Sequence, residues 1–281
     1  GQDDRGTIED ILRVGTSAGG ARAKAVLAWN PETGQFRSGQ APANKGFAHW
    51  LMKFDGVHGN RDRELADPQG FGRIEYAYSL MAHDAGIAMQ ECRLQEEGGR
   101  AHFMTRRFDR TDQGEKLHMQ SLGAMRHYDF NQAGAYAYEQ AIETIQLLAL
   151  PIEDVEQQIR RTFLNLLARN HDDHVKNIAF LMNKQGQWRL SPAFDVAYSY
   201  NPSGAWTSRH QMSLNGKRDN FQLDDLLAFA NSAGFKKARA MALLREVAAS
   251  VENWRNHATT AGVSARDRKR IEQTFRLHLA A

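Results

Sequence analysis

A short polar stretch in the middle of the chain carries most of the side chains that could do chemistry. It covers residues 170–177 and reads Asn-His-Asp-Asp-His-Val-Lys-Asn. Apolar runs flank it: residues 159–167 have the spacing of a helix face that packs in a core, and residues 178–182 are short and apolar enough for a buried strand. The pattern is typical of a catalytic loop, and equally of a polar helix-to-strand connection on the surface.

The spacing within this stretch indicates a particular chemistry. Asp172 precedes Asn177 by five positions, as in the catalytic loop of protein kinases, where the Asp accepts the proton of the attacking hydroxyl and the Asn binds magnesium. Residues 178–190 predict a β-hairpin, and a hairpin brings its two ends together, so Asn177 should lie near Asp195. An amide and a carboxylate, completed by phosphate oxygens and water, suit Mg²⁺.

The first third of the chain predicts the elements that such a site requires. A strand is expected over residues 8–14, followed by a glycine-rich segment, 15–24, whose backbone N–H groups could approach an anion. Further strands are expected over 25–29 and 48–54, the latter carrying Lys53. Strand, glycine loop, strand and strand-borne lysine follow the order of a kinase N-lobe.

The glycine-rich segment also allows a different interpretation. Residues 15–19 match Gly-x-Ser-x-Gly, the nucleophile elbow of serine hydrolases. That elbow requires a helix directly after it, whereas a run patterned as a strand follows here. The sequence therefore favours a phosphate-binding loop over a hydrolase.

Beyond these strands, a helix is expected over 72–86, with Glu75 in its first turns. In a kinase such a glutamate pairs with the strand lysine, although it would also suit the helix dipole by itself. The polar segment 55–67 predicts a mobile loop, either a lid over a nucleotide or a solvated linker. Strands are expected over 91–95 and 101–107, and residues 106–110 then leave the sheet where a hinge would lie, or simply as a charged strand end.

After Arg110 the pattern is almost entirely helical, with helices expected over 133–150, 153–169, 223–230, 236–254 and 266–279. We therefore predict an α+β, bilobal, protein-kinase-like fold with a small β-rich N-lobe, residues 1–110, and a larger all-helical C-lobe, residues 111–281. The C-lobe would contain the catalytic loop and the metal site.

The composition of the chain bears on its partners and its compartment. The 281 residues have a hydrophobic fraction of 42% and a net charge of +3, which is too small an excess to predict strong direct nucleic-acid binding. The single cysteine, Cys92, excludes an intrachain disulfide and suits a reducing compartment. The longest apolar stretch, 145–152, is far short of the ~20 residues of a membrane helix. No signal peptide is visible, so we expect a cytoplasmic protein without membrane contact.

Four motifs together resemble the HipA family, bacterial serine/threonine kinases that act as toxins of toxin–antitoxin systems. They are the glycine-rich segment 15–24, Arg-Phe-Asp-Arg at 107–110, Asp-Asp-His-x-Lys-Asn at 172–177 and Ser-Pro-x-Phe-Asp at 191–195. Each motif is weak alone, but their order along nearly the whole chain makes the joint match specific. Family members commonly carry a subdomain before the glycine loop; almost nothing precedes Ile8 here, so that subdomain is expected to be removed or supplied by another chain.

The resemblance implies roles for individual residues. Asp172 would be the catalytic base, Asn177 and Asp195 would bind Mg²⁺, and Glu75 would support Lys53 as an ion pair. Ser17, or its neighbour Thr16, would be phosphorylated by the enzyme itself. The ATP contacts implied are Gly19, Gly20, Ala21, Arg22, Ala23, Lys24, Lys53, Arg106, Arg107, Phe108, His174, Lys176, Asn177 and Asp195.

The resemblance further implies transfer of the ATP γ-phosphate to Ser or Thr of a target protein, typically an aminoacyl-tRNA synthetase in this family. A helix-turn-helix antitoxin would be the partner and would carry the DNA contact. The stronger alternative is a small-molecule phosphotransferase of the aminoglycoside type, which shares the Asp–Asn–Asp arrangement. A metal hydrolase using His171 and His174 would need further His and Asp residues on other helices, and no such His–Asp pair is evident. A binding-only pseudokinase is the third alternative, but all the polar residues expected of an active kinase are present.

Overall fold

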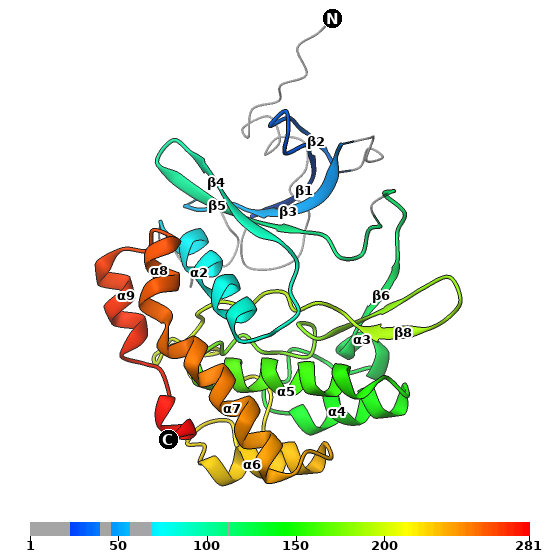
Figure 1. Ribbon diagram of the computed structural model, residues 1–281, viewed down its shortest axis with the longest axis vertical. Coiled ribbons are helices and arrows are strands. Elements are labelled where there is room, and N and C mark those ends of the chain that lie inside the picture. The colour runs from blue at the N-terminus through cyan, green and yellow to red at the C-terminus, as the bar shows by residue number, and fades with distance from the viewer. Residues whose placement is uncertain (1–22, 40–45, 57–68, 112) are drawn as a thin grey trace, which may run out of the picture. The chain divides into compact units, whose positions relative to one another are not determined.

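The computed structural model describes residues 23–39, 46–56, 69–111 and 113–281 (Figure 1). The chain forms two compact units: residues 1–76 with 90–117, and residues 77–89 with 118–281. The division runs through helix α2, Phe71–Asp84. The segments 1–22, 40–45 and 57–68 lie outside the described residues, and with them the predicted strand 8–14 and most of the predicted loop 55–67.

The first unit is built on an antiparallel sheet with the strand order β2-β1-β3-β5-β4. Its core is an apolar cluster on the central strands, including Leu27, Trp50 and Met104. The strands expected over 25–29, 48–54, 91–95 and 101–107 are present, whereas the short strand over 36–38 was not predicted. The strands are β1 Lys24–Trp29, β2 Phe36–Ser38, β3 Ala48–Lys53, β4 Cys92–Glu97 and β5 Arg100–Arg106.

Helix α2 begins where a distant carboxylate caps it. The carboxylate of Asp55 accepts hydrogen bonds from the backbone N–H groups of Gly70 and Phe71, at 2.9–3.1 Å. Asp55 is buried, and its own N–H donates to His102 Nδ1 at 2.9 Å. The prediction that a mobile loop begins at Asp55 is therefore wrong for this residue, because an acidic group at a helix N-terminus satisfies N–H groups that the helix leaves unpaired.

The second unit contains a three-stranded antiparallel sheet, so the prediction of an all-helical C-lobe is wrong. The strands are β6 His118–Ser121, β7 Ala179–Met182 and β8 Trp188–Leu190, in the order β6-β7-β8. The β7–β8 hairpin was expected from its apolar strands and turn. Strand β6 reads His-Met-Gln-Ser and has no apolar pattern; it forms only because β7, distant in sequence, supplies its hydrogen bonds.

Helices make up most of the second unit, and α5 packs against both α4 and α7 (Figure 1). The predicted helix 266–279 breaks after Glu272, and the helix expected from residue 133 starts at Tyr138. Two short helices, α3 and α8, were not predicted. The helices are α3 Leu122–Arg126, α4 Tyr138–Leu147, α5 Ile152–Leu167, α6 Leu223–Ser232, α7 Lys237–Glu252, α8 Trp254–Thr260, α9 Ala265–Glu272 and the 3₁₀ helix η1 Leu277–Ala280.

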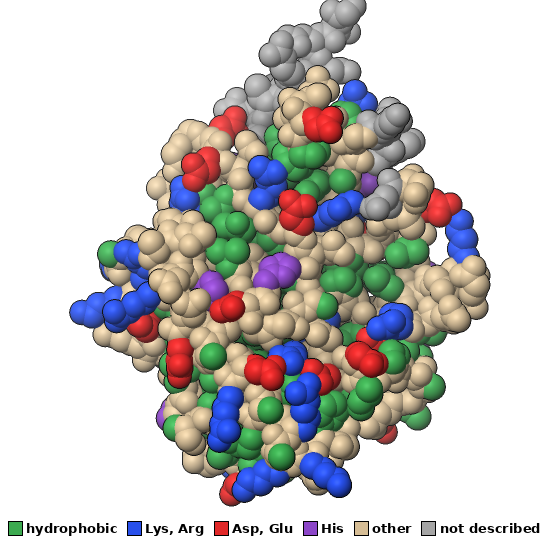
Figure 2. Space-filling model, viewed as in Figure 1, with side chains coloured by type: hydrophobic (Ala, Val, Ile, Leu, Met, Phe, Trp, Pro, Cys, Tyr) green, Lys and Arg blue, Asp and Glu red, His purple; other side chains and the backbone are tan. Residues whose placement is uncertain are grey.

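The outer faces of α5 and α7 carry charges of both signs, which Figure 2 shows interspersed over the helical part of the surface. Arg239 pairs with Glu156 at 2.7 Å and lies 4.0 Å from Glu246. This surface is therefore mixed rather than basic. None of the helices in the described ranges is both long and apolar enough to cross a membrane.

Gly72 is a point where helix α2 approaches the sheet of the first unit too closely for a side chain. A Cβ at this position would lie 2.0 Å from the carbonyl oxygen of Ala101 in β5. We predict that Gly72→Ala lowers the free energy of unfolding by about 1–3 kcal/mol through overpacking, although alanine is the better helix former. Urea denaturation measures the change, with Arg73→Ala on the same helix as the control. A stabilised Gly72→Ala protein would contradict this close approach.

Candidate active site

In the first unit, strand β3 and helix α2 bring Lys53 and Glu75 together. Lys53 Nζ lies 2.5 Å from Glu75 Oε1, and the side chains are 13% and 2% exposed. The antiparallel register places Lys24 of β1 directly opposite Lys53. Residues directly opposite one another in an antiparallel pair lie on the same face of the sheet, so Lys24 and Lys53 bring positive charge to one face.

The other predicted residues of the first unit lie at strand ends. Arg106 ends β5, and the N–H of Arg107 donates to the carbonyl of His49 at 2.9 Å. The Arg107 guanidinium forms a two-pronged ion pair with Asp109, at 2.5 and 2.7 Å. Phe108 is half-buried in the turn that follows the strand. Thr16, Ser17 and residues 19–22 lie outside the described residues, whereas Ala23 and Lys24 lie at the start of β1.

In the second unit, the loop after α5 holds Asp172 by its backbone and leaves the carboxylate exposed. The N–H of Asp172 donates to Ser199 Oγ at 2.9 Å, and its carbonyl accepts from Asn177 Nδ2 at 2.8 Å. The side chain of Asp172 is 57% exposed, with His174 Nε2 at 3.6 Å. A fixed backbone beneath an exposed carboxylate suits a group that contacts a substrate hydroxyl.

Asn177 and Asp195 line the same small cavity of about 30 Å³, as the hairpin geometry predicted. Because Asn177 donates through its amide nitrogen to Asp172, its amide oxygen is the atom left to act as a ligand. Asp195 adopts a left-handed backbone conformation, with φ of 52°. Such strain in a residue other than glycine is often found at functional sites.

The cavity is polar as well as small. Gln158 Oε1, Arg161 Nε and His174 Nδ1 belong to residues that line it, and these buried atoms have no hydrogen-bond partner within the described part of the chain. Buried polar atoms of this kind normally bind water or a ligand, and the volume suffices for ordered water. An amide oxygen and a carboxylate in such a cavity fit partly hydrated Mg²⁺. No group of three or more His, Cys, Asp or Glu side chains among the described residues could hold a metal by itself.

His174 lines this cavity, and both His174 and Lys176 lie close to the ring of Phe130. Lys176 Nζ lies 3.7 Å from the centroid of the Phe130 ring, and the His174 ring centroid lies 5.7 Å from it. Phe130 is 38% exposed. The aromatic ring therefore orients a cation beside the loop through a cation–π contact.

Asp173, the residue that anchors this loop, was not predicted from the sequence. It is buried, and its carboxylate accepts hydrogen bonds from Tyr138 Oη at 2.5 Å, His210 Nδ1 at 2.7 Å and the N–H of Gln211 at 2.7 Å. Burial alone would raise the pKa of Asp173, but the hydrogen bonds that its carboxylate accepts from His210, Tyr138 and the N–H of Gln211 hold the pKa below its usual value. Two consecutive aspartates gave no signal as to which one is buried.

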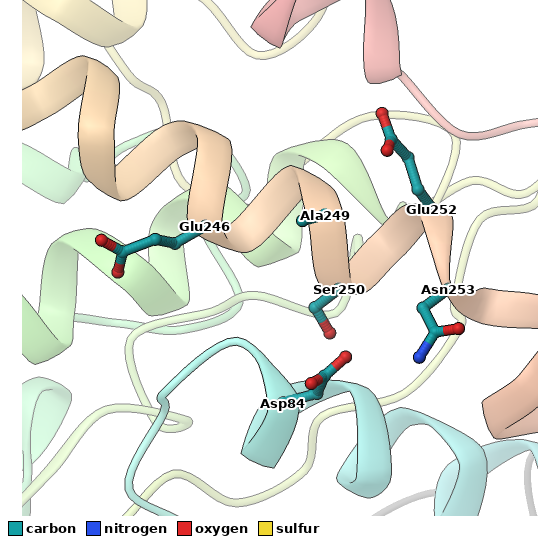
Figure 3. Close-up of a pocket in the computed structure, with 6 residues that line it drawn as sticks. All are labelled: Asp84, Glu246, Ala249, Ser250, Glu252 and Asn253. Carbon is teal, nitrogen blue, oxygen red and sulfur yellow. The ribbon is translucent and has the colours of Figure 1, made fainter.

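Another hollow of the second unit lies elsewhere, at the ends of α2 and α7 (Figure 3), and has a volume of about 460 Å³. Its lining includes Asp84, Glu246 and Ser250. Ser250 Oγ already donates to the carbonyl of Met81, and Asp84 pairs with His257 at 3.1 Å. This hollow contains none of the predicted site residues.

Comparisons with known proteins show two solved structures with a similar fold. Its fold resembles that of HipA in a complex of HipA, HipB and operator DNA from the toxin–antitoxin system of Shewanella oneidensis MR-1, with a TM-score of 0.68 at 16% identity, covering 94% of this chain and 63% of that one. It also resembles CtkA, a proinflammatory kinase of Helicobacter pylori, with a TM-score of 0.51 at 12% identity, covering 83% of this chain and 89% of that one. The fold is therefore mixed α/β and similar to the folds of these two proteins. No curated protein sequence matches the chain.

The family follows from the sequence itself. Residues 16–255 match the model of the HipA-like C-terminal domain, so this chain belongs to that family. The family assigned from the four motifs is thereby confirmed. The chain spans 63% of the length of the Shewanella HipA.

We predict that Lys53 stabilises the first unit through Glu75. Lys53→Met removes the cation 2.5 Å from a carboxylate that is 2% exposed, which should cost about 3 kcal/mol of folding free energy. The double variant Lys53→Met with Glu75→Gln should recover most of it. Urea denaturation measures both. Arg73→Met, which breaks the ion pair with the exposed Glu96, is the control and should cost less than about 1 kcal/mol. Equal losses at the two sites would count against a buried pair.

We predict a pH dependence of stability from His171. Burial, and then the neighbouring His210, lower the pKa of His171 to about 2. The unfolded chain takes up this proton near pH 6.5, so the stability is complete above that pH and falls as the pH decreases toward 2. Between pH 6.5 and 5 the loss should be about 2 kcal/mol. His171→Gln should remove this loss and the exposed His83→Gln should retain it, as measured by denaturation at each pH. An unchanged slope in His171→Gln would refute the assignment.

Proposed function

We propose that this protein is an ATP- and Mg²⁺-dependent serine/threonine protein kinase of the HipA type. One observation carries the proposal: an exposed carboxylate, Asp172, lies on a loop fixed by backbone hydrogen bonds, and the same loop delivers Asn177 to a cavity that Asp195 also lines. This is the arrangement of base and metal ligands that phosphoryl transfer requires.

The roles of the second unit's residues follow from their chemistry. Asp172 orients the hydroxyl of the acceptor and takes its proton as the oxygen attacks the γ-phosphorus, while the bond from that phosphorus to the bridging oxygen breaks and ADP leaves. The Asn177 amide oxygen and the Asp195 carboxylate hold Mg²⁺, which when bound offsets the charge on the phosphate oxygens. Lys176 and His174 offer donors beside the cavity, with Phe130 orienting the lysine.

The first unit contributes phosphate binding. Lys53, held by Glu75 and facing Lys24 across the sheet, offers positive charge to the nucleotide phosphates. Residues 19–24 bind the nucleotide through backbone N–H groups, and residues 106–108 contact the adenine. Residues 1–110 are proposed as the N-lobe of the kinase and residues 111–281 as its C-lobe.

Substrate and partners are proposed from family membership. The acceptor is Ser or Thr of a protein, with an aminoacyl-tRNA synthetase as the first candidate, and Ser17 or Thr16 is phosphorylated by the enzyme itself. A helix-turn-helix antitoxin binds the protein and makes most of the DNA contact. The complex of the Shewanella HipA with HipB and operator DNA and the net charge of only +3 on this chain support this division of labour.

The decisive prediction concerns Asp172. Asp172→Asn keeps the backbone hydrogen bonds and removes the base, so turnover of ³²P transfer from ATP to protein in a lysate should fall by ~10²-fold or more. Asp224→Asn, on the exposed start of α6, should leave turnover unchanged. Both variants should melt within a few degrees of the unmodified protein.

Two outcomes would overturn the proposal. Full turnover in a folded Asp172→Asn protein would remove the catalytic assignment. Labelling of aminoglycosides or other small alcohols with no protein acceptor would assign the chain to a small-molecule phosphotransferase instead.

A further inference from the structure

Near the C-terminal end of the chain, the charged side chain of Arg276 is buried in the second unit. Arg276 lies between α9 and η1, and its side chain is only 5% exposed. A buried guanidinium is costly unless it is fully hydrogen-bonded. Its partners therefore indicate what its burial achieves.

Arg276 is joined to the catalytic loop through one histidine. Its Nη1 lies 2.9 Å from His210 Nε2, and His210 Nδ1 lies 2.7 Å from Asp173 Oδ2. A guanidinium has only donors, so Nε2 of His210 must accept from it. The proton of neutral His210 then lies on Nδ1 and is donated to Asp173. Arg276 thus fixes the tautomer that Asp173 requires.

Arg276 is itself anchored on two sides. Its guanidinium pairs with Asp219 and donates to the carbonyl of Leu166 at 3.3 Å, while its N–H donates to the carbonyl of Leu167 at 2.9 Å. Burial, and then the nearby Arg169, lower the pKa of Arg276 to about 10. It therefore remains a cation at neutral pH, and its position is set by the end of α5.

A second chain of hydrogen bonds reaches the loop from the opposite direction. Tyr138 accepts from Asn165 at 3.0 Å and donates to Asp173 at 2.5 Å. Asn165 also accepts from Asn170 at 2.9 Å. Ser199 donates to Asn170 at 2.9 Å and accepts the N–H of Asp172 at 2.9 Å. Residues on both sides of Asp172 are thus fixed, while its own side chain is 57% exposed.

We infer that Arg276 is a positioning residue, through which the C-terminal segment holds His210 and Asp173 and so fixes the loop that carries Asp172. Its effect on loop order is independent of what the protein does. Its effect on turnover rests on the proposed function, because it acts through the base of that reaction. Geometric errors of about 1 Å in a catalytic group can cost 10²-fold in rate, so even a modest loss of order should be measurable.

The test compares Arg276→Gln with Arg255→Gln, which breaks an ion pair to Glu272 where the arginine side chain is 77% exposed. Amide hydrogen exchange of residues 170–177 should accelerate ~10-fold or more in Arg276→Gln, while exchange in α4 and α7 stays nearly unchanged. The kcat for protein phosphorylation should fall ~10-fold and the KM for ATP should stay the same. Arg276→Lys keeps the charge, so its loop exchange rate and its kcat should lie between those of Arg276→Gln and those of the unmodified protein.

Asp219→Asn provides a second variant should Arg276→Gln not fold, since Asp219 is 33% exposed and its loss leaves the arginine in place. It should accelerate exchange of the same loop to a smaller extent. Unchanged loop exchange in either variant, or an acceleration shared evenly by the whole unit, would overturn the inference and leave Arg276 a purely structural residue. An inactive unmodified protein with the expected exchange pattern would refute the proposed kinase and retain the positioning role.

Discussion

The second unit depends on one buried carboxylate, that of Asp173. An ion removed from water must be paired and hydrogen-bonded, and Asp173 meets this requirement with donors from Tyr138, His210 and the backbone of Gln211. These donors come from α4 and from the loop before α6, so satisfying one carboxylate draws separate segments together. The adjacent Asp172 then lies on a rigid backbone while its side chain faces water.

The first unit uses the same physical device on a smaller scale. Asp55 satisfies the start of α2, and the helix then presents the nearly buried Glu75 to Lys53 of β3. Each contact fixes the position of a charged group. Because Lys53 is partly removed from water, it attracts a phosphate more strongly than a lysine in bulk water would. In both units, therefore, a buried carboxylate fixes the position of a functional charged residue: Glu75 fixes Lys53, and Asp173 fixes the loop of Asp172.

The likeness in fold to HipA at 16% identity has a physical basis. Core positions require apolar character and suitable volume more than particular side chains, so sequences can diverge widely while the elements stay in place. The polar contacts described here, such as those of Asp173 and Arg276, are of a different kind, because each donor must meet a particular acceptor. Proteins that share this fold can therefore differ in the polar contacts that support the site.

The sequence by itself determined the elements with strong local signals and the residues with a recognisable spacing. Short strand-like runs rich in apolar residues specified β1, β3 and β5, helical periodicity specified α5 and α7, and the hairpin predicted that Asn177 and Asp195 would lie close together. Only the tertiary structure decided that β6 is a strand and that Asp55 is a helix cap. It also decided that Asp173, not Asp172, is the buried member of the pair and that Arg276 reaches it through His210. These outcomes rest on hydrogen bonds between residues far apart in the chain, whose partners no local pattern encodes.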